Sequence, residues 1–459
     1  MSIILLIAVP LLAAFISIIF KKIATYLLVA VGIFNLVVLF IAPMGVITIG
    51  GFTPPIGISL LFDTYSQFSL VLINALIIII ALLNCKSFNK YSGILLLAMA
   101  SLNGLLLTND LFNLFVFLEI AGIAAYLITT SNKKPLKTFH YLILGAVGSS
   151  LFLFGVVILY SMFGTLNMVD MIIKINNTNN YDQLILPFTL MFIGLGVEAK
   201  LLPFNSWVKG VLGKSNTLSG PMIASVYAAA MSFVLGRYIT NLFMFEGNLL
   251  LVVTVLLSLG ILIGEAMAFQ STKARKILLF SSVAQASIIA LLFVNGVVIW
   301  AVYYIIAAAL SKLVLFLVIN KATKEVGNDN LDNLQGLFSN NILVGLTFTL
   351  ATLSVMGMPL LVGFVIKLNF LTQLAAASQI WLVVIILVAS VVEGIYFVRM
   401  LVKLWYKGKE QINVKYHISF KIVFVLVAAV LLVLGTYKAP LDNYDSTIDT
   451  VSQEVINNG

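Results

Sequence analysis

The chain has 459 residues, of which 61% are hydrophobic and only 9% are charged, and its formal net charge is +9. Soluble domains carry roughly a quarter charged residues, so the composition excludes a soluble protein and predicts a polytopic, all-α membrane protein. The basic residues lie in short loops between apolar segments, which indicates membrane orientation and argues against a nucleic-acid partner.

Fourteen apolar segments are long enough to cross a bilayer, which takes about 20 apolar residues per helix. They lie at roughly 2–20, 24–44, 62–84, 91–107, 110–131, 137–163, 183–208, 217–243, 248–269, 276–295, 298–320, 340–377, 380–406 and 418–436. The first is followed by Lys21 and Lys22 and lacks a small-residue cleavage site. We therefore interpret it as a retained helix and not as a signal peptide.

Loops rich in lysine and arginine alternate with loops nearly free of them, and the rich loops hold 20 of the 26 basic residues. These residues are Lys21, Lys22, Lys86, Lys90, Lys133, Lys134, Lys137, Lys209, Lys214, Lys273, Arg275, Lys276, Lys321, Lys324, Arg399, Lys403, Lys407, Lys409, Lys415 and Lys421. The positive-inside rule then places both termini outside the cytoplasm. The predicted location is the cell's inner, cytoplasmic membrane.

The alternation also decides how residues 340–377 cross the membrane. This segment is long enough for two helices, with Gly357-Met358-Pro359 as a turn between them. Two crossings would move the following basic cluster to the opposite side, so we interpret the segment as one long, broken helix.

Two predicted helices are broken in the same way. The seventh is interrupted at Pro203 beside Lys200, and the twelfth, five helices later, at Pro359 with Lys367 close by. Helices five apart cross in opposite directions, which predicts two inverted repeats, helices 4–8 and 9–13. The expected organisation is one membrane domain over 1–459: helices 1–3 in 1–90, repeats in 91–243 and 248–406, and the last helix with a short tail in 407–459.

Four ionisable residues lie deep within apolar segments: Glu119, Lys200, Lys312 and Lys367. A charge at bilayer depth costs roughly 2.5–3.5 kcal/mol on insertion scales, so each marks a candidate functional site. Lys200 could instead extend to the surface from a helix end. A buried charge needs a partner, and we expect Glu119 to pair with Lys200.

Glu198, Glu265, Gln285 and Glu393 are auxiliary candidates. For Glu265 and Glu393 the alternative is that they face loops or a neighbouring subunit. Burial favours the neutral forms of lysine and glutamate, so such groups exchange protons readily near neutral pH. A row of them linked by water would form a proton path.

Soluble-type catalytic motifs are absent: the sequence has no GxGxxG, Walker, HExxH, GxSxG or CxxC pattern. Its single cysteine, Cys85, excludes a disulfide within the chain, a cysteine-ligated cluster and a structural zinc site. Its two histidines, His140 and His417, argue against histidine ligation of a metal or haem. We expect no cofactor, no metal and no catalytic redox centre in this chain.

Six stretches carry a pattern that extends over most of the chain, each weak alone. They are GGFTPPIGISLLFDTYS at 50–66, DLFNLFVFLEIAG at 110–122, GVEAKLLPFNSW at 196–207, KARKILLFSSVAQAS at 273–287, ALSKLVLF at 309–316 and GMPLLVGFVIK at 357–367. In this order and spacing they resemble the antiporter-like subunits shared by respiratory complex I, Mrp-type Na+/H+ antiporters and energy-converting membrane-bound hydrogenases.

The resemblance implies a proton-translocating subunit of a multi-subunit, redox-driven ion pump, with the oxidoreductase or hydrogenase chemistry in other subunits. It implies that Glu119 and Lys200 form a switching pair, that Lys312 is a relay and that Lys367 is the exit-side group. The implied partners are other membrane subunits of the same complex, related antiporter-like subunits among them, together with the lipid bilayer and H+.

The sequence departs from the family pattern at three positions. The family usually has a lysine where this chain has Ala229, a histidine where it has Ala308, and another histidine where it has Asn205. Two alternatives therefore stay open: an Mrp-type Na+/H+ antiporter subunit, and a structural subunit that has lost its proton path. Polar residues or water between Lys200 and Lys367 would favour transport, and a dry, leucine-packed gap would favour the structural role.

Overall fold

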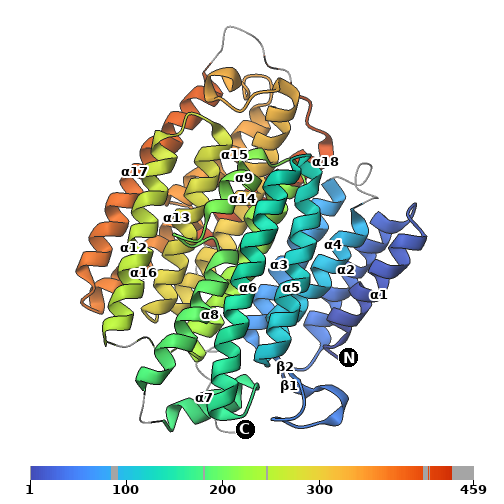
Figure 1. The fold of residues 1–459 in the computed structure, drawn as a ribbon. Helices are drawn as coiled ribbons and strands as arrows, with labels where there is room; N and C mark the ends of the chain where they lie inside the picture. The colour runs from blue at the N-terminus through green and yellow to red at the C-terminus, as the bar shows by residue number, and fades with distance from the viewer. Residues whose placement is uncertain are drawn as a thin grey trace.

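A computed structural model describes residues 2–83, 91–178, 181–243, 245, 247–406, 412 and 414–436. This part of the chain is predominantly helical, which confirms the all-α membrane fold (Figure 1). The inferences that concern Cys85, Lys86, Lys90, Lys407, Lys409 and the tail at 437–459 lie outside the described residues.

The helices follow one another closely along the chain (Figure 1). The first part contains α1 (Leu5–Ile19), α2 (Ala24–Ile41), α3 (Thr64–Leu83), α4 (Ser92–Leu107), α5 (Leu111–Thr129), α6 (Pro135–Phe163), α7 (Met168–Asn176), α8 (Ile185–Glu198), α9 (Ser206–Val211), α10 (Ser219–Pro221) and α11 (Ala228–Asn241). The second part contains α12 (Gly247–Gln270), α13 (Ala274–Val294), α14 (Val298–Val326), α15 (Ile342–Met356), α16 (Val362–Ala376), α17 (Ile380–Trp405) and α18 (Ile418–Thr436). A π-helical turn at Met222–Tyr227 joins α10 to α11.

Ten helices within the described residues are long and apolar enough to cross a membrane. Four other predicted segments hold shorter pieces: α1, α4, the broken helix α8–α9 and the broken helix α15–α16. The chain is therefore a multi-pass membrane protein, whereas the count of fourteen crossings and the inverted repeats stay predictions.

Helices α15 and α16 both pack along α17. Trp405, at the end of α17, donates through Nε1 to Thr349 Oγ1 of α15 at 3.0 Å, while Glu393, near the middle of α17, contacts Lys367 of α16. Because α17 has 26 residues and is about 39 Å long, this arrangement agrees with one broken helix running once beside α17.

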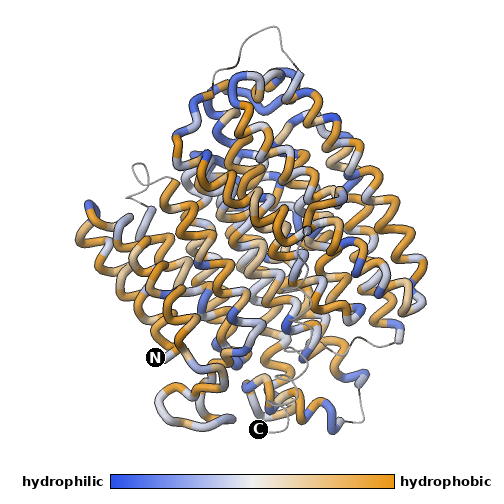
Figure 2. Tube along the Cα trace, turned by 180° about the vertical axis from the view of Figure 1, so that it is seen from behind, coloured by the Kyte–Doolittle hydropathy of each residue, from blue (hydrophilic) through white to orange (hydrophobic). Residues whose placement is uncertain are grey.

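Contacts gather four of the basic loops at one end of the bundle. Arg275 Nε donates to Asn320 Oδ1 at 2.8 Å, and Asn320 Nδ2 donates to the Asn216 carbonyl, also at 2.8 Å. Asn216 Nδ2 in turn donates to Ser131 Oγ at 2.9 Å. Hydrophilic residues are prominent at this upper end in Figure 2, while the helices between the ends are mainly hydrophobic.

The opposite end carries two elements that the sequence did not predict, α7 and a hairpin of β1 (Gly45–Thr48) and β2 (Ser59–Phe62). The strands are antiparallel, with Gly45 opposite Phe62. Asn167, which caps α7, donates through Nδ2 to Ser59 Oγ of β2 at 2.8 Å. An ion pair between Arg237 of α11 and Asp63, 2.7 Å long, ties the hairpin to the helices.

The core of the bundle is formed by α11, α13 and α14. The share of the apolar span buried inside the chain is 94% for α13 and 89% for α14, against 33% for α17 and 28% for α18. A side chain on α13 or α14 therefore meets protein on nearly every side, and polar groups there must find partners within the chain.

Candidate functional site

The first broken helix buries Lys200 in the interval between α8 and α9. Lys200 has a positive φ of 65°, in the left-handed region that non-glycine residues rarely adopt, and its side chain is 1% exposed. Its Nζ donates to Ser282 Oγ of α13 at 2.9 Å. The lysine therefore points into the protein, and the alternative that it extends to the surface is wrong.

Aromatic side chains support this break. The Val197 carbonyl, in the last turn of α8, accepts a hydrogen bond from Trp207 Nε1 at 3.0 Å. Tyr141 of α6 stacks on Trp207 with a ring-centroid distance of 4.1 Å and donates through its hydroxyl to Glu198 Oε2 at 3.2 Å. Glu198, two residues before Lys200 in the sequence, is thus held by a tyrosine hydroxyl, which does not neutralise the charge of the carboxylate.

Glu119 does not bond directly to Lys200. The ion pairs within the described residues do not include these two, and the Lys200 ammonium donates to a serine. Glu119, half-buried on α5, lies near enough to Glu198 for their charges to interact. An approach of Glu119 to Lys200 during turnover stays a prediction.

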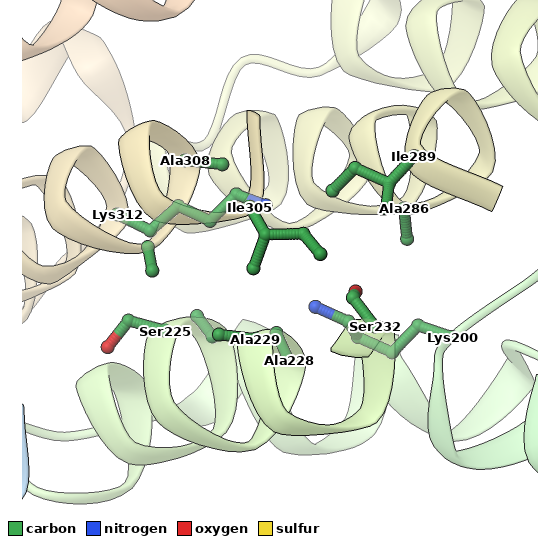
Figure 3. Close-up of a pocket in the computed structure, with 12 residues that line it drawn as sticks. Lys200, Ser225, Ala228, Ala229, Ser232, Ala286, Ile289, Ile305, Ala308 and Lys312 are labelled. Carbon is green, nitrogen blue, oxygen red and sulfur yellow. The ribbon is translucent and has the colours of Figure 1, made fainter. Parts of the chain in front are cut away.

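A cavity of about 10 Å³ separates Lys200 from Lys312, and both lysines line it (Figure 3). Their side chains extend toward one another from opposite ends of the cavity (Figure 3). Helix α11 and the π-helical turn form one wall, and α13 and α14 form the other. The remaining lining residues are Ala224, Ser225, Ala228, Ala229, Ser232, Ala286, Ile289, Ile305, Ala308 and Ala309.

The second broken helix buries Lys367 just beyond the interval between α15 and α16. Lys367 Nζ forms a 2.6 Å ion pair with Glu393 Oε2 of α17 and donates to the Met356 carbonyl at 3.1 Å. A Cβ on Gly357 would lie 2.7 Å from Lys367 Cδ, so glycine lets the lysine pass over the end of α15. Gly357 also has a φ of 82°, which favours glycine.

The auxiliary candidates from α12, α13 and α17 meet at this second lysine. Gln285 Nε2 donates to Glu393 Oε1 at 3.4 Å, and the charges of Glu265 and Glu393 interact. Glu265 and Glu393 are each 2% exposed, so the alternative that they face loops or a neighbouring subunit is wrong. The structure therefore brings Glu265, Gln285, Lys367 and Glu393 together.

Sequence reasoning missed Ser282 and Tyr141, which hold Lys200 and Glu198. The signal for Ser282 was present, because Ser281 and Ser282 interrupt an otherwise apolar run on α13. Hydroxyl groups at bilayer depth mark the face of a helix that contacts other polar groups. Tyr141 had no such signal, since tyrosine is common in membrane helices near either interface.

Three known proteins show the likeness over most of their length. NADH-quinone oxidoreductase subunit N of Desulforudis audaxviator (strain MP104C) is 29% identical over 380 residues, covering 79% of this chain and 76% of that protein. A Na(+)/H(+) antiporter subunit of Bacillus subtilis (strain 168) is 25% identical over 384 residues, covering 79% and 77%. A chain of the membrane-bound sulfane sulfur reductase (MBS), an archaeal respiratory membrane complex, superposes with a TM-score of 0.90 at 28% identity, covering 98% and 97%.

The family described as NADH:quinone oxidoreductase/Mrp antiporter, TM, has a sequence model that matches residues 108–393. This match extends over more than half of the chain and includes all eight residues singled out above, from Glu119 to Glu393. The chain therefore belongs to the NADH:quinone oxidoreductase/Mrp antiporter transmembrane family.

Proposed function

We propose that this chain is the proton-translocating, antiporter-like subunit of a multi-subunit, redox-driven ion pump in the cytoplasmic membrane, with both termini on the extracytoplasmic side. Glu119, Lys200, Lys312 and Lys367 carry the proton, and Glu198 and Gln285 support the route. Neighbouring membrane subunits supply the redox chemistry. Family membership and the likeness to a chain of a respiratory membrane complex support this assignment.

The cavity between Lys200 and Lys312 is the observation that carries the proposal. Its volume of about 10 Å³ is near the minimum that accommodates one water molecule. Ala229 and Ala308, which stand where the resembled family has a lysine and a histidine, both line it. Small side chains thus leave room for water at the position of the missing relay groups, and a water there bridges the two lysines.

Two lysines facing one cavity favour the sharing of a proton. Two ammonium groups that face one enclosed cavity repel each other, because their charges are screened less there than in water, so a doubly charged cavity is costly. Charging one lysine therefore favours deprotonation of the other. The proton then passes through the water from Lys200 to Lys312.

The route continues from Lys312 toward Lys367. The charges of Lys312 and Glu393 interact, and Glu393 is paired with Lys367. The cavity lining contains alanine, serine, isoleucine and lysine and no leucine. These features favour transport over a structural subunit whose path has been lost.

Filling the cavity tests the route. The full chain, with the subunits that co-purify, is reconstituted into liposomes that contain a pH-sensitive dye, and a potassium diffusion potential drives proton uptake. Ala308→Val projects two methyl groups into the cavity, and uptake should fall at least tenfold. Ala307→Val is the matched control, because Ala307 is similarly buried on the same helix and does not line the cavity.

Wild-type uptake in the Ala308→Val variant would show that protons do not pass through the cavity. The same liposomes separate the antiporter alternative, which the likeness to a Na(+)/H(+) antiporter subunit favours. Proton movement that requires Na+ on the opposite side of the membrane would assign the chain to Na+/H+ exchange. Equal movement in sodium-free buffer supports proton transport alone.

A further inference from the structure

Glu265 has a position that the proposed proton route does not use. It lies toward the C-terminal end of α12, is 2% exposed and interacts electrostatically with both Glu393 and Lys367. Its Oε2 has no hydrogen-bond partner among the described residues. Gln285 Oε1, on a side chain that is 1% exposed, likewise has none in this part of the chain. Two buried oxygen atoms of this cluster, one on Glu265 and one on Gln285, therefore accept no hydrogen bond from the described residues.

The charges in this cluster do not balance if both glutamates are ionised. The Lys367 ammonium makes its ion pair with Glu393, at 2.6 Å, and the Gln285 amide donates to the other oxygen of the same carboxylate. Glu265 faces this closed pair without a cation of its own, with Tyr396 and Tyr304 as further neighbours. An unpaired carboxylate buried at this depth would cost several kcal/mol, and a neutral acid avoids that cost.

We propose that Glu265 holds a proton beside the closed Lys367–Glu393 pair and exchanges it with Glu393, which makes it the proton-storing residue at the Lys367 end of the route. This inference rests on the proposed function for its role in transport. The storage site itself follows from burial, the single ion pair and the unpartnered carboxyl oxygen.

The exchange moves one proton per cycle and conserves charge. The Glu265 carboxyl group gives its proton to the Glu393 carboxylate, so the negative charge moves to Glu265 and Lys367 loses its partner. The Lys367 ammonium then releases a proton toward the exit, and the neutral amine takes the proton from Glu393, which closes the pair again. The Glu265 carboxylate is reloaded by the proton that arrives from Lys312.

Infrared spectroscopy of the purified chain in lipid nanodiscs tests the storage site directly, because a protonated carboxyl group has a carbonyl-stretch band that a carboxylate lacks. Glu265→Gln should abolish this band, and Glu265→Asp should retain it at a shifted position. Glu325→Gln, which changes an exposed glutamate of α14, is the matched control and should leave the band intact. Lys367→Met should add a second band, because Glu393 then lacks its cation.

Transfer to Glu393 is tested by the rate at which the Glu265 band shifts after dilution into D2O. Glu393→Gln removes the acceptor and should slow this shift at least tenfold. An unchanged rate would overturn the exchange, and a band that survives Glu265→Gln would overturn the storage site. These readouts need no transport, so a chain that shows the band but moves no protons would contradict the proposed function and leave the storage site standing.

Discussion

Lys200 and Lys367 both lie at a break in an apolar helix, yet their amino groups meet different partners. Lys367 bonds to the Glu393 carboxylate at 2.6 Å, whereas Lys200 bonds to the Ser282 hydroxyl at 2.9 Å. Lys200 also faces a second lysine across a cavity. A broken helix thus provides the space for a buried amine, and the neighbouring helices decide which group that amine meets.

The two lysines therefore differ in whether a counter-charge lies beside the buried amine. A buried ammonium beside a carboxylate is compensated, whereas one beside a hydroxyl alone is not. In the proposed route, Lys200 is therefore the lysine from which a proton moves with less rearrangement. Three substitutions test this difference between Lys367 and Lys200.

The largest effect on stability is expected from Lys367→Met. The change leaves Glu393 buried without its cation, and the free energy of unfolding should fall by about 3–5 kcal/mol. The double variant Lys367→Met/Glu393→Leu should recover most of this loss, because neither charge is then left unpaired. Tryptophan fluorescence during thermal unfolding in detergent measures both. Equal losses in the single and double variants would contradict a coupled pair.

Lys200→Met should have a smaller effect on stability and a large one on transport. The variant loses one hydrogen bond to a neutral hydroxyl, a change of about 0.5–1.5 kcal/mol in the free energy of unfolding. Proton uptake into liposomes should nevertheless drop to the level of protein-free vesicles. A loss of stability as large as that of Lys367→Met would mean that Lys200 also has a buried counter-charge.

Ser282→Ala should have a smaller effect on transport than Lys200→Met. It removes the partner of Lys200 and retains the helix, so unfolding should become easier by about 1 kcal/mol and proton uptake should slow severalfold without being abolished. Ser287→Ala is the matched control on α13, because the Ser287 hydroxyl donates to the Val283 carbonyl of its own helix. Uptake slowed equally by both substitutions would argue against a specific role for Ser282.

The long helices could be predicted from the sequence because apolar length and composition alone define a membrane span. The predicted segment at 298–320 lies within α14, which continues to Val326, and the segment at 183–208 contains α8 and the break and ends inside α9. Helix α7 and the β1–β2 hairpin were missed. Such short elements gain most of their stability from tertiary contacts, here with each other through Asn167 and Ser59.

The buried lysines were also visible in the sequence, because a charge within an apolar span stands out wherever the helix is placed. Their partners were not visible. Whether Lys200 meets Glu119 or Ser282 depends on how α5 and α13 are rotated about their axes, and hydrophobicity around these helices is too even to fix that rotation. Glu393 was identified as ionisable, but its pairing with Lys367 required the packing of α17 against α16.

The π-helical turn at Met222–Tyr227 determines which side of α11 faces the cavity. Such a turn contains one residue more than an α-helical turn, and one residue corresponds to a rotation of about 100° and a rise of about 1.5 Å. Deleting one residue there would turn Ala229 and Ser232 away from the cavity and, at the far end of α11, draw Arg237 away from Asp63. A change in chain length at this turn would thus close the proposed water route and loosen the hairpin anchor together.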